Sequence, residues 1–232
     1  MSQKTIGLIG GMSWESSSVY YKIINQEVKK ALGGVHSCQS LLYSVDFEDI
    51  AALQYKGDWN QLAARMVEAA TTLEKAGASC IVLCTNTMHK LADNIEDAVT
   101  IPFLHIADAT AEAIKNHNLK KVGLLGTKFT MEQDFLKQRL FDNHSIETIV
   151  PNEKGREVVH NIIYNELVKG IVTEESRQAY LSVIADLMAQ GAEGIILGCT
   201  EIGLLITPEH TDVTLFDTTE IHAKKAVDWY LK

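Results

Sequence analysis

The stretch IVLCTNTMH, residues 81–89, is the part of the sequence from which the fold can be predicted. Its first three residues are β-branched or aliphatic, which is typical of a strand buried on both faces of a parallel sheet. A cysteine, Cys84, follows directly, and small polar residues follow the cysteine. The pattern therefore predicts a strand that carries a thiol at its carboxyl-terminal end.

The same pattern recurs further along the chain. The segment GASCIVLCT begins at Gly77, and GAEGIILGCT begins at Gly191, with one residue inserted before its cysteine, Cys199. The segment IGLIG at residues 6–10 likewise recurs as VGLLG at residues 122–126. Blocks that recur in the same order and at nearly the same separation are typical of a duplicated structural unit.

Strands alternate with helical segments along the whole chain. The first strand, at residues 6–10, is followed by a helical pattern at residues 19–28, a second strand at residues 41–45 and a long helix at residues 59–76. This alternation is typical of parallel sheets flanked by helices. We predict an α/β fold of two pseudo-symmetric lobes with the active site in the cleft between them. The expected N-terminal lobe comprises residues 1–103 and a returning segment, 210–232, and the expected second lobe comprises residues 104–209.

Composition excludes several classes of function. The net charge of −9 argues against a protein that binds nucleic acid or an anionic membrane surface. The apolar run after Lys4 is too short for a signal sequence or a membrane span, so the expected location is the cytoplasm. The cysteines lack zinc-site spacing and are too few for a disulfide framework, and they are expected to be free thiols. They are Cys38, Cys80, Cys84 and Cys199.

Two thiols at strand ends suit the inversion of a carbon acid. Ligands of open α/β sheets bind beyond the carboxyl ends of the strands. If an approximate twofold axis relates the lobes, Cys84 and Cys199 face each other across the cleft. One then removes a proton from a tetrahedral carbon as a thiolate, and the other returns a proton to the opposite face as a thiol. A cysteine pKa of about 8.5 is close enough to neutrality for both forms to coexist.

The residues around each thiol are suited to bind a small carboxylate. Thr85, Asn86 and Thr87 follow Cys84, and Thr200 follows Cys199. Turns into helices offer backbone N–H groups and side-chain donors at such positions. The turn Gly10-Gly11-Met12-Ser13 and its counterpart Gly126-Thr127 are expected to form the remaining walls.

Several residues near these segments allow two interpretations. Glu201 either tunes Cys199 or caps a helix, and Met12 and Trp14 either close the cleft or pack in a core. Cys38 and Cys80 are interpreted as core residues. Three histidines without metal-site spacing are expected to be solvated or packing residues. They are His89, His105 and His222.

Around these residues the chain resembles the aspartate/glutamate racemase family of cofactor-independent amino-acid racemases. The resemblance is carried by GGMSWES from Gly10, LCTNTMH from Leu83 and LGCTEI from Leu197. It implies two pseudo-symmetric lobes, catalysis by Cys84 and Cys199, no pyridoxal phosphate or metal, and a homodimer. It also implies that Asn86, Thr87, Thr127 and Thr200 hold the α-carboxylate and ammonium groups. The full predicted substrate-binding set is Gly11, Met12, Ser13, Gln54, Asn86, Thr87, Thr127, Val168, Thr200 and Glu201.

The preferred substrate follows from two windows, residues 46–54 and 164–170. Members of this family that favour acidic amino acids generally place Arg or Lys there, close to the distal carboxylate. In this chain the only base in either window is Lys169. Since burying a carboxylate without a cationic partner is costly, we predict a broad-specificity racemase for neutral or polar side chains. If Lys169 or Lys56 turns inward, an aspartate- or glutamate-specific racemase is expected instead.

Three other functions remain as alternatives. A related cysteine-dependent isomerase or decarboxylase needs only one proton donor for its carbanion. A nucleotide-binding domain is suggested by the turn at residues 7–11 and by Asp46, but no G-x-G-x-x-G motif or Walker lysine follows. A non-catalytic amino-acid-binding module uses the same cleft without turnover.

Overall fold

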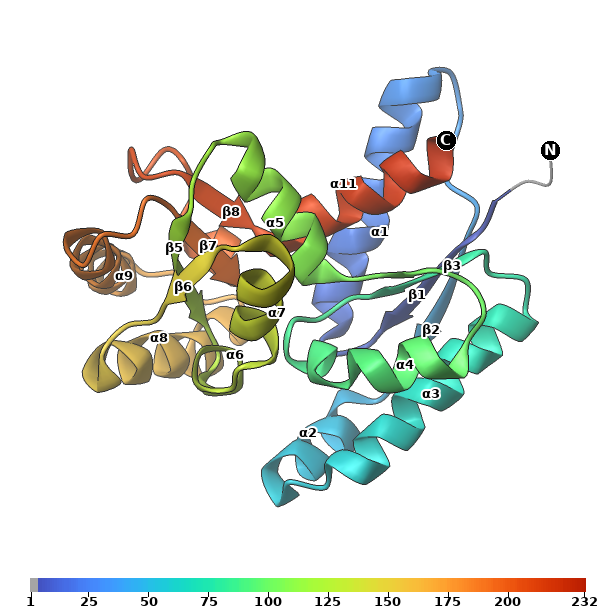
Figure 1. Ribbon diagram of the computed structural model, residues 1–232, viewed down its shortest axis with the longest axis horizontal. Coiled ribbons are helices and arrows are strands. Elements are labelled where there is room, and N and C mark those ends of the chain that lie inside the picture. The colour runs from blue at the N-terminus through green and yellow to red at the C-terminus, as the bar shows by residue number, and fades with distance from the viewer. Residues whose placement is uncertain (1–3) are drawn as a thin grey trace. The chain divides into compact units, whose positions relative to one another are not determined.

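The computed structural model describes residues 4–232 and contains two four-stranded parallel sheets (Figure 1). The chain forms two compact units, one made of the residues up to Ile106 together with His222–Lys232, the other of Ala107–Ile221. Each unit has one parallel sheet flanked by helices, so the predicted fold class is confirmed. Residues 1–3, which the prediction included in the N-terminal lobe, lie outside the described residues.

The first unit has the strand order β2-β1-β3-β4, with every neighbouring pair parallel. Its elements are β1 (Ile6–Gly10), α1 (Trp14–Leu32), β2 (Ser40–Ser44), α2 (Phe47–Lys56), α3 (Trp59–Lys75), β3 (Cys80–Leu83), the 3₁₀ helix η1 (Thr87–Leu91), α4 (Ala92–Ala98) and β4 (Phe103–Leu104). The last helix of the chain, α11 (Thr218–Leu231), belongs to this unit from His222 onward.

Side-chain alternation along β1 and β3 divides the core of the first unit into two layers. Ile9 and Leu83 pack with residues of α2, α3 and α4, whereas Leu8, Val82 and Cys84 pack with residues of α1 and α11. Figure 1 shows α1 and α11 on one side of this sheet and α3 and α4 on the other. Both faces of the central strands are therefore buried, as their continuous apolar sequence predicts.

The second unit has the strand order β6-β5-β7-β8, again entirely parallel. Its elements are α5 (Ile106–Asn116), β5 (Lys121–Gly126), α6 (Lys128–Glu132), α7 (Phe135–His144), β6 (Glu147–Ile149), α8 (Glu153–Asn165), the 3₁₀ helix η2 (Leu167–Lys169), α9 (Glu174–Ala189), β7 (Ile195–Gly198), α10 (Ile202–Leu205), β8 (Leu215–Asp217) and the first residues of α11. The largest core cluster packs Leu125 of β5 and Leu197 of β7 against α8, α9 and α10.

The two sheets have the same connectivity and matching registers. Ile9 of β1 is paired with Leu83 of β3, and Leu125 of β5 is paired with Leu197 of β7. These four residues occupy corresponding places in the repeated segments of the sequence. The sequence repeat is therefore a repeat of sheet topology.

The division of the chain differs from the expected boundaries at 103/104 and 209/210. The first unit extends to Ile106, and the return to it begins at His222. Residues 215–217 form β8, which hydrogen-bonds to β7 with Leu197 opposite Asp217, so they belong to the second sheet. A strand of three residues gives too short an apolar run to be recognised in the sequence.

None of the helices found in residues 4–232 combines the length and the apolar character that crossing a membrane requires.

Candidate active site

Cys84 follows β3 directly and continues its pairing with β1, because its backbone N–H donates to the Ile9 carbonyl at 2.9 Å. The side chain is completely buried on the face of the sheet that packs against α1 and α11. The thiol lies 3.9 Å from the Val82 carbonyl oxygen. Burial raises the pKa of the Cys84 thiol well above its usual range.

Two side chains hold the backbone at this thiol. The Ser16 hydroxyl donates to the Cys84 carbonyl at 3.2 Å, and His89 Nδ1 lies 2.7 Å from the Thr85 carbonyl oxygen. Neither contact was predicted. His89 was interpreted as a solvated or packing residue. The four-residue spacing from Thr85 to His89, one turn apart in a helical segment, is the signal that could have indicated the second contact.

The turn after β1 depends on Gly11. Its φ angle is +94°, and a Cβ atom there would lie 2.2 Å from the Val45 carbonyl oxygen, so only glycine fits. Its N–H donates to the Ser17 hydroxyl at 2.8 Å. Of the two residues that were expected to close the cleft or to pack, Met12 is buried in the core and Trp14 is 67% exposed.

Ser13 and Thr127 occupy equivalent positions, each as the N-cap of the helix that follows the first strand of its unit. Ser13 Oγ accepts the Ser16 N–H at 3.2 Å, and Thr127 Oγ1 accepts the Thr130 N–H at 3.4 Å. Both hydroxyl groups therefore fix helix starts beside the carboxyl ends of the strands.

Cys199 follows β7 directly, and the inserted Gly198 is the last residue of that strand. A Cβ atom on Gly198 would lie 2.9 Å from the Leu125 carbonyl oxygen, which explains why glycine occupies this position. The Cys199 side chain is partly buried and packs against the cluster that contains Leu125 and Leu197. The inserted residue thus places the Cys199 thiol on the face of its sheet that packs against α8 and α9. The corresponding face of the first sheet packs against α2 and α3, but Cys84 lies on the other face, against α1 and α11.

A carboxylate is in contact with the Cys199 thiol. The thiol donates to Glu201 Oε2 at 3.0 Å, and the Thr200 hydroxyl donates to the same oxygen at 2.6 Å. Burial raises the pKa of Cys199 well above its usual range, and the charge of Glu201 and its hydrogen bond to the thiol raise it further. Glu201 precedes α10 but makes no capping hydrogen bond to it. Of its two predicted interpretations, contact with Cys199 is the one observed.

The remaining predicted residues are distributed as follows. Asn86 is buried, and Thr87 begins η1 after Cys84. Gln54 is buried and its amide nitrogen lies 3.2 Å from the sulfur of Met88, which places it in the core of the first unit. Val168 is 39% exposed on η2.

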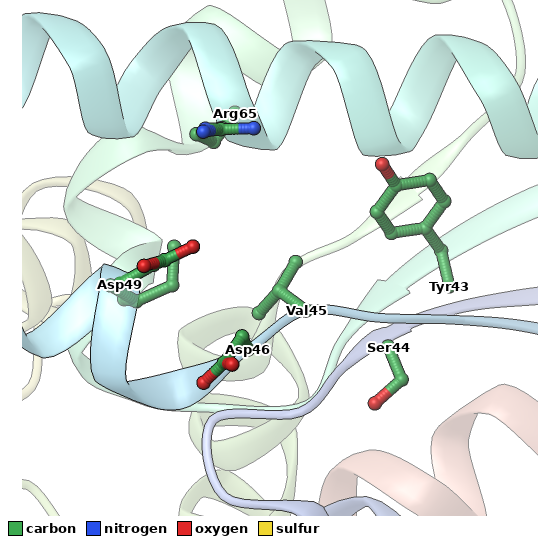
Figure 2. Close-up of a pocket in the computed structure, with 7 residues that line it drawn as sticks. Tyr43, Ser44, Val45, Asp46, Asp49 and Arg65 are labelled. Carbon is green, nitrogen blue, oxygen red and sulfur yellow. The ribbon is translucent and has the colours of Figure 1, made fainter.

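The bases whose orientation bears on substrate choice, Lys56 and Lys169, are both exposed. A small pocket of about 240 Å³ lies in the first unit at the end of β2, and residues of the predicted window 46–54 form part of its lining. Figure 2 shows Asp46 and Asp49 on one side of it and Arg65 of α3 on the other. The charged lining of this pocket therefore contains two carboxylates and one guanidinium group.

The three histidines singled out in the sequence are all buried, so they are packing residues and none is solvated. The four cysteines are free thiols, as expected, and burial raises the pKa of Cys38 and of Cys80 to about 12. Within residues 4–232, no three His, Cys, Asp or Glu side chains form a group that could hold a metal ion.

Known proteins resemble the chain over almost its full length. The profile of the Asp/Glu/Hydantoin racemase family matches residues 9–226. The broad specificity amino-acid racemase RacX of Bacillus subtilis is 25% identical, over 97% of this chain and 98% of its own. A Yersinia pestis crystal structure provisionally named an Asp/Glu racemase is 56% identical, with a TM-score of 0.94, and covers 99% of this chain and 100% of its own.

A second solved structure, an aspartate racemase homologue from Pyrococcus horikoshii, is 33% identical with a TM-score of 0.87, over 99% of this chain and 100% of its own. The predicted family and the predicted enzyme class are thereby confirmed. The chain belongs to the Asp/Glu/Hydantoin racemase family, whose reaction class is that of an isomerase.

Proposed function

We propose that this protein is a broad-specificity amino-acid racemase that interconverts L- and D-amino acids by proton transfer between two cysteines and the α-carbon, without a cofactor. The proposal rests on one observation in a chain that belongs to the racemase family. In each of the two sheets, a cysteine directly follows the carboxyl end of the third strand in sequence order. Ligands of parallel sheets bind at these ends.

The reaction begins at the Cys199–Glu201 pair. Glu201 accepts the Cys199 proton across their 3.0 Å contact and leaves a thiolate. The thiolate removes the α-proton of the substrate, and the electron pair of the broken C–H bond stays on the α-carbon as a carbanion. The Cys84 thiol then donates its proton to the opposite face, which inverts the centre.

Proton exchange with solvent resets the enzyme. After one inversion Cys199 carries the substrate proton, Glu201 carries the proton it accepted, and Cys84 is a thiolate. Cys84 regains a proton and Glu201 loses one, so that the number of protons balances over the cycle. The other enantiomer reacts from the form in which Cys84 is the thiolate and Cys199 the acid. This mechanism requires both sulfur atoms to reach one α-carbon.

The residues around the thiols would bind the common part of an amino acid. Asn86, Thr87, Thr127 and Thr200 are proposed to hold its carboxylate and ammonium groups, with Gly11, Met12 and Ser13 beside them. The positions of Ser13 and Thr127 at helix starts support this assignment, since backbone N–H groups at helix starts favour anions. Gln54 and Val168 are proposed to influence which substrate side chains are accepted.

Broad specificity for neutral or polar side chains is supported by two observations. The exposed Lys56 and Lys169 offer no buried cation for a second carboxylate. A full-length relative is named a broad specificity amino-acid racemase. The competing proposal, an aspartate- or glutamate-specific enzyme, is favoured by the names of the two solved structures.

We also propose that the protein works in the cytoplasm as a homodimer. Free thiols persist in a reducing compartment. Light scattering coupled to size-exclusion chromatography measures the oligomeric state, and a monomeric mass at working concentration would contradict the dimer.

Incubation of the dialysed, chelator-treated protein with single enantiomers of the common amino acids in deuterated water tests the function. We expect α-hydrogen exchange with inversion for several neutral or polar amino acids. Inversion of aspartate or glutamate alone would support the specific racemase. Loss of carbon dioxide would indicate the decarboxylase, and neither exchange nor inversion with any substrate would indicate a binding module.

A further inference from the structure

One carboxylate oxygen of the second unit is in contact with two donors at once. Glu201 Oε2 accepts a hydrogen bond from the Thr200 hydroxyl at 2.6 Å and another from the Cys199 thiol at 3.0 Å. The three residues are consecutive in sequence and directly follow β7. The oxygen that the proposed mechanism uses to receive the Cys199 proton is therefore already bonded to Thr200.

The contact with Thr200 opposes transfer of that proton. A hydrogen bond to a carboxylate favours its charged form, and short bonds from a hydroxyl to a carboxylate are among the strong ones. Burial raises the pKa of Cys199 most, and the charge of Glu201 and its hydrogen bond to the thiol raise it further. Hydrogen bonds from the backbone at Glu201 and Thr200 lower it. In the free enzyme the sulfur therefore keeps its proton.

The Thr200 hydroxyl can donate to only one acceptor at a time. It carries a single hydrogen, and in the free enzyme this hydrogen points to Glu201. Thr200 is also among the residues proposed to hold the carboxylate of the substrate, and its side chain is partly exposed. A substrate carboxylate that receives the hydrogen of Thr200 must take it from Glu201.

We propose that the Thr200 hydroxyl couples substrate binding to the activation of Cys199. When an amino acid binds, the hydroxyl turns from Glu201 to the substrate carboxylate, and Glu201 then accepts the thiol proton. The S–H bond of Cys199 breaks, an O–H bond forms on Glu201, and the electron pair stays on sulfur as a thiolate. This inference rests on the proposed function. It explains how the enzyme forms its base only beside a bound substrate.

Other titratable groups of the second unit interact with this site through their charge. Burial raises the pKa of Tyr180 well above its usual range. The charges of Cys199, Glu166 and Glu201 raise it further. The Tyr180 hydroxyl donates to the Val159 carbonyl at 3.1 Å and stays neutral at working pH. Glu201, in direct contact with the thiol, is therefore the acceptor that the coupling uses.

Two substitutions of Thr200 and one control isolate the hydroxyl. Thr200→Val replaces the hydroxyl by a methyl group of similar size, whereas Thr200→Ser keeps the hydroxyl and removes the methyl group. Thr100 supplies the control, because its exposed hydroxyl donates to Glu74 at the same distance, 2.6 Å, in the first unit. Thr100→Val thus removes an equivalent threonine–glutamate contact, and melting temperatures check that all variants fold.

The first readout uses the free enzyme and requires no turnover. Iodoacetamide reacts with the thiolate, and mass spectrometry of the labelled peptides reports Cys199 alone. We expect Thr200→Val to be alkylated at Cys199 about tenfold faster than the wild type at neutral pH, and Thr200→Ser and Thr100→Val at nearly the wild-type rate. In a Glu201→Gln background, Thr200→Val should change the rate by less than about twofold. An unchanged rate in Thr200→Val, or the same acceleration without the Glu201 carboxylate, would overturn the proposal.

The second readout is steady-state kinetics with an amino acid that the enzyme racemises. Valine offers the substrate carboxylate no hydrogen bond, so we expect Thr200→Val to raise KM by about tenfold. Its kcat should stay within about threefold of the wild-type value, because Glu201 is released from Thr200 in both substrate complexes. An unchanged KM, or a fall in kcat of about tenfold or more, would overturn the coupling. If no amino acid is racemised, the proposed function fails, while the alkylation rates still report whether Thr200 controls Cys199 through Glu201.

Discussion

The two cysteines follow corresponding strands of two equivalent sheets, yet their surroundings differ. Cys84 is fully buried. Ser16 contacts the carbonyl oxygen of Cys84 itself, and His89 contacts the carbonyl oxygen of the next residue, Thr85. Cys199 is partly exposed, and its thiol donates to Glu201. Burial is the sole cause of the raised pKa of Cys84, whereas a carboxylate adds to burial at Cys199. The fold is duplicated, and the proton chemistry at the two thiols is not.

This difference assigns separate tasks to the two thiols. A buried thiol without a base in contact keeps its proton and suits the role of acid in the resting enzyme. A thiol that donates to a carboxylate has an internal acceptor for its proton and suits the role of base. We therefore expect substitutions around the two cysteines to have unequal effects on the kinetics of the two enantiomers.

The largest effect is expected from removing either sulfur. Cys84→Ser and Cys199→Ser should each lower the racemisation rate by at least about 1,000-fold, because a serine hydroxyl is a far weaker acid and base at neutral pH. Polarimetry or chiral chromatography measures the rate, and far-UV circular dichroism checks folding. Activity near that of the wild type in one variant would remove that cysteine from the mechanism.

Replacement of Glu201 is expected to have the next largest effect. Glu201→Gln keeps the size of the side chain and removes its charge, so kcat should fall by about 100-fold. Removing that negative charge also lowers the pKa of Cys199, so iodoacetamide should alkylate Cys199 faster at neutral pH while alkylation of Cys84 is unchanged. Mass spectrometry of the labelled peptides separates the two thiols.

The exposed Glu209 supplies the matched control for that experiment. Glu209→Gln removes one negative charge of the same unit and should change neither kcat nor either alkylation rate. An equal response in the two variants would show that net charge, and not the contact between Glu201 and Cys199, controls the thiol.

The pH dependence should change in the same variant. In the wild type the Cys199 proton moves to Glu201, so kcat/KM should vary little between pH 7 and 9. In Glu201→Gln the Cys199 proton must leave to solvent, and burial keeps that thiol mostly protonated. We therefore expect kcat/KM of this variant to rise about tenfold per pH unit at pH values below the pKa of Cys199. Parallel pH profiles for the two proteins would contradict the role of Glu201 as internal base.

The smallest effect is expected at the pocket beyond β2. Asp46 and Asp49 line it together with Arg65, and the excess of negative charge should disfavour acidic side chains. Asp49→Asn should raise kcat/KM for aspartate relative to a neutral amino acid by less than about tenfold, because surface charges are screened by solvent and salt. Asp142→Asn, an exposed carboxylate of the second unit, is the control, and an equal ratio in the two variants would exclude this pocket from substrate selection.

The sequence was sufficient to predict the duplicated parallel sheets, because continuous apolar strands and the repeated glycine and cysteine segments are local patterns. It did not reveal α2, whose capping residues Asp46 and Gly57 enclose a mixed polar and apolar segment that was interpreted mainly as a substrate window. β8 was also missed, since three residues carry too little periodicity.

The site was predicted less completely than the fold. Cys84 and Cys199 were named from the sequence, and contact with Cys199 was one of two interpretations of Glu201. The effect of the inserted Gly198 on side-chain direction was not predicted, because alternation depends on where the strand ends. The contact of His89 with Ile106 and that of Gln54 with Met88 join residues that are distant in sequence. Such contacts follow from tertiary packing and leave no local pattern.

The central claim is that two different sulfur atoms act on opposite faces of one α-carbon. Its most direct test is mass spectrometry of substrate and product early in the conversion of a single protonated enantiomer in deuterated water. Two thiols predict that the product carries deuterium at the α-carbon while the remaining substrate carries almost none. Deuterium that enters the substrate as fast as the product would show that one group serves both faces, and would contradict the account.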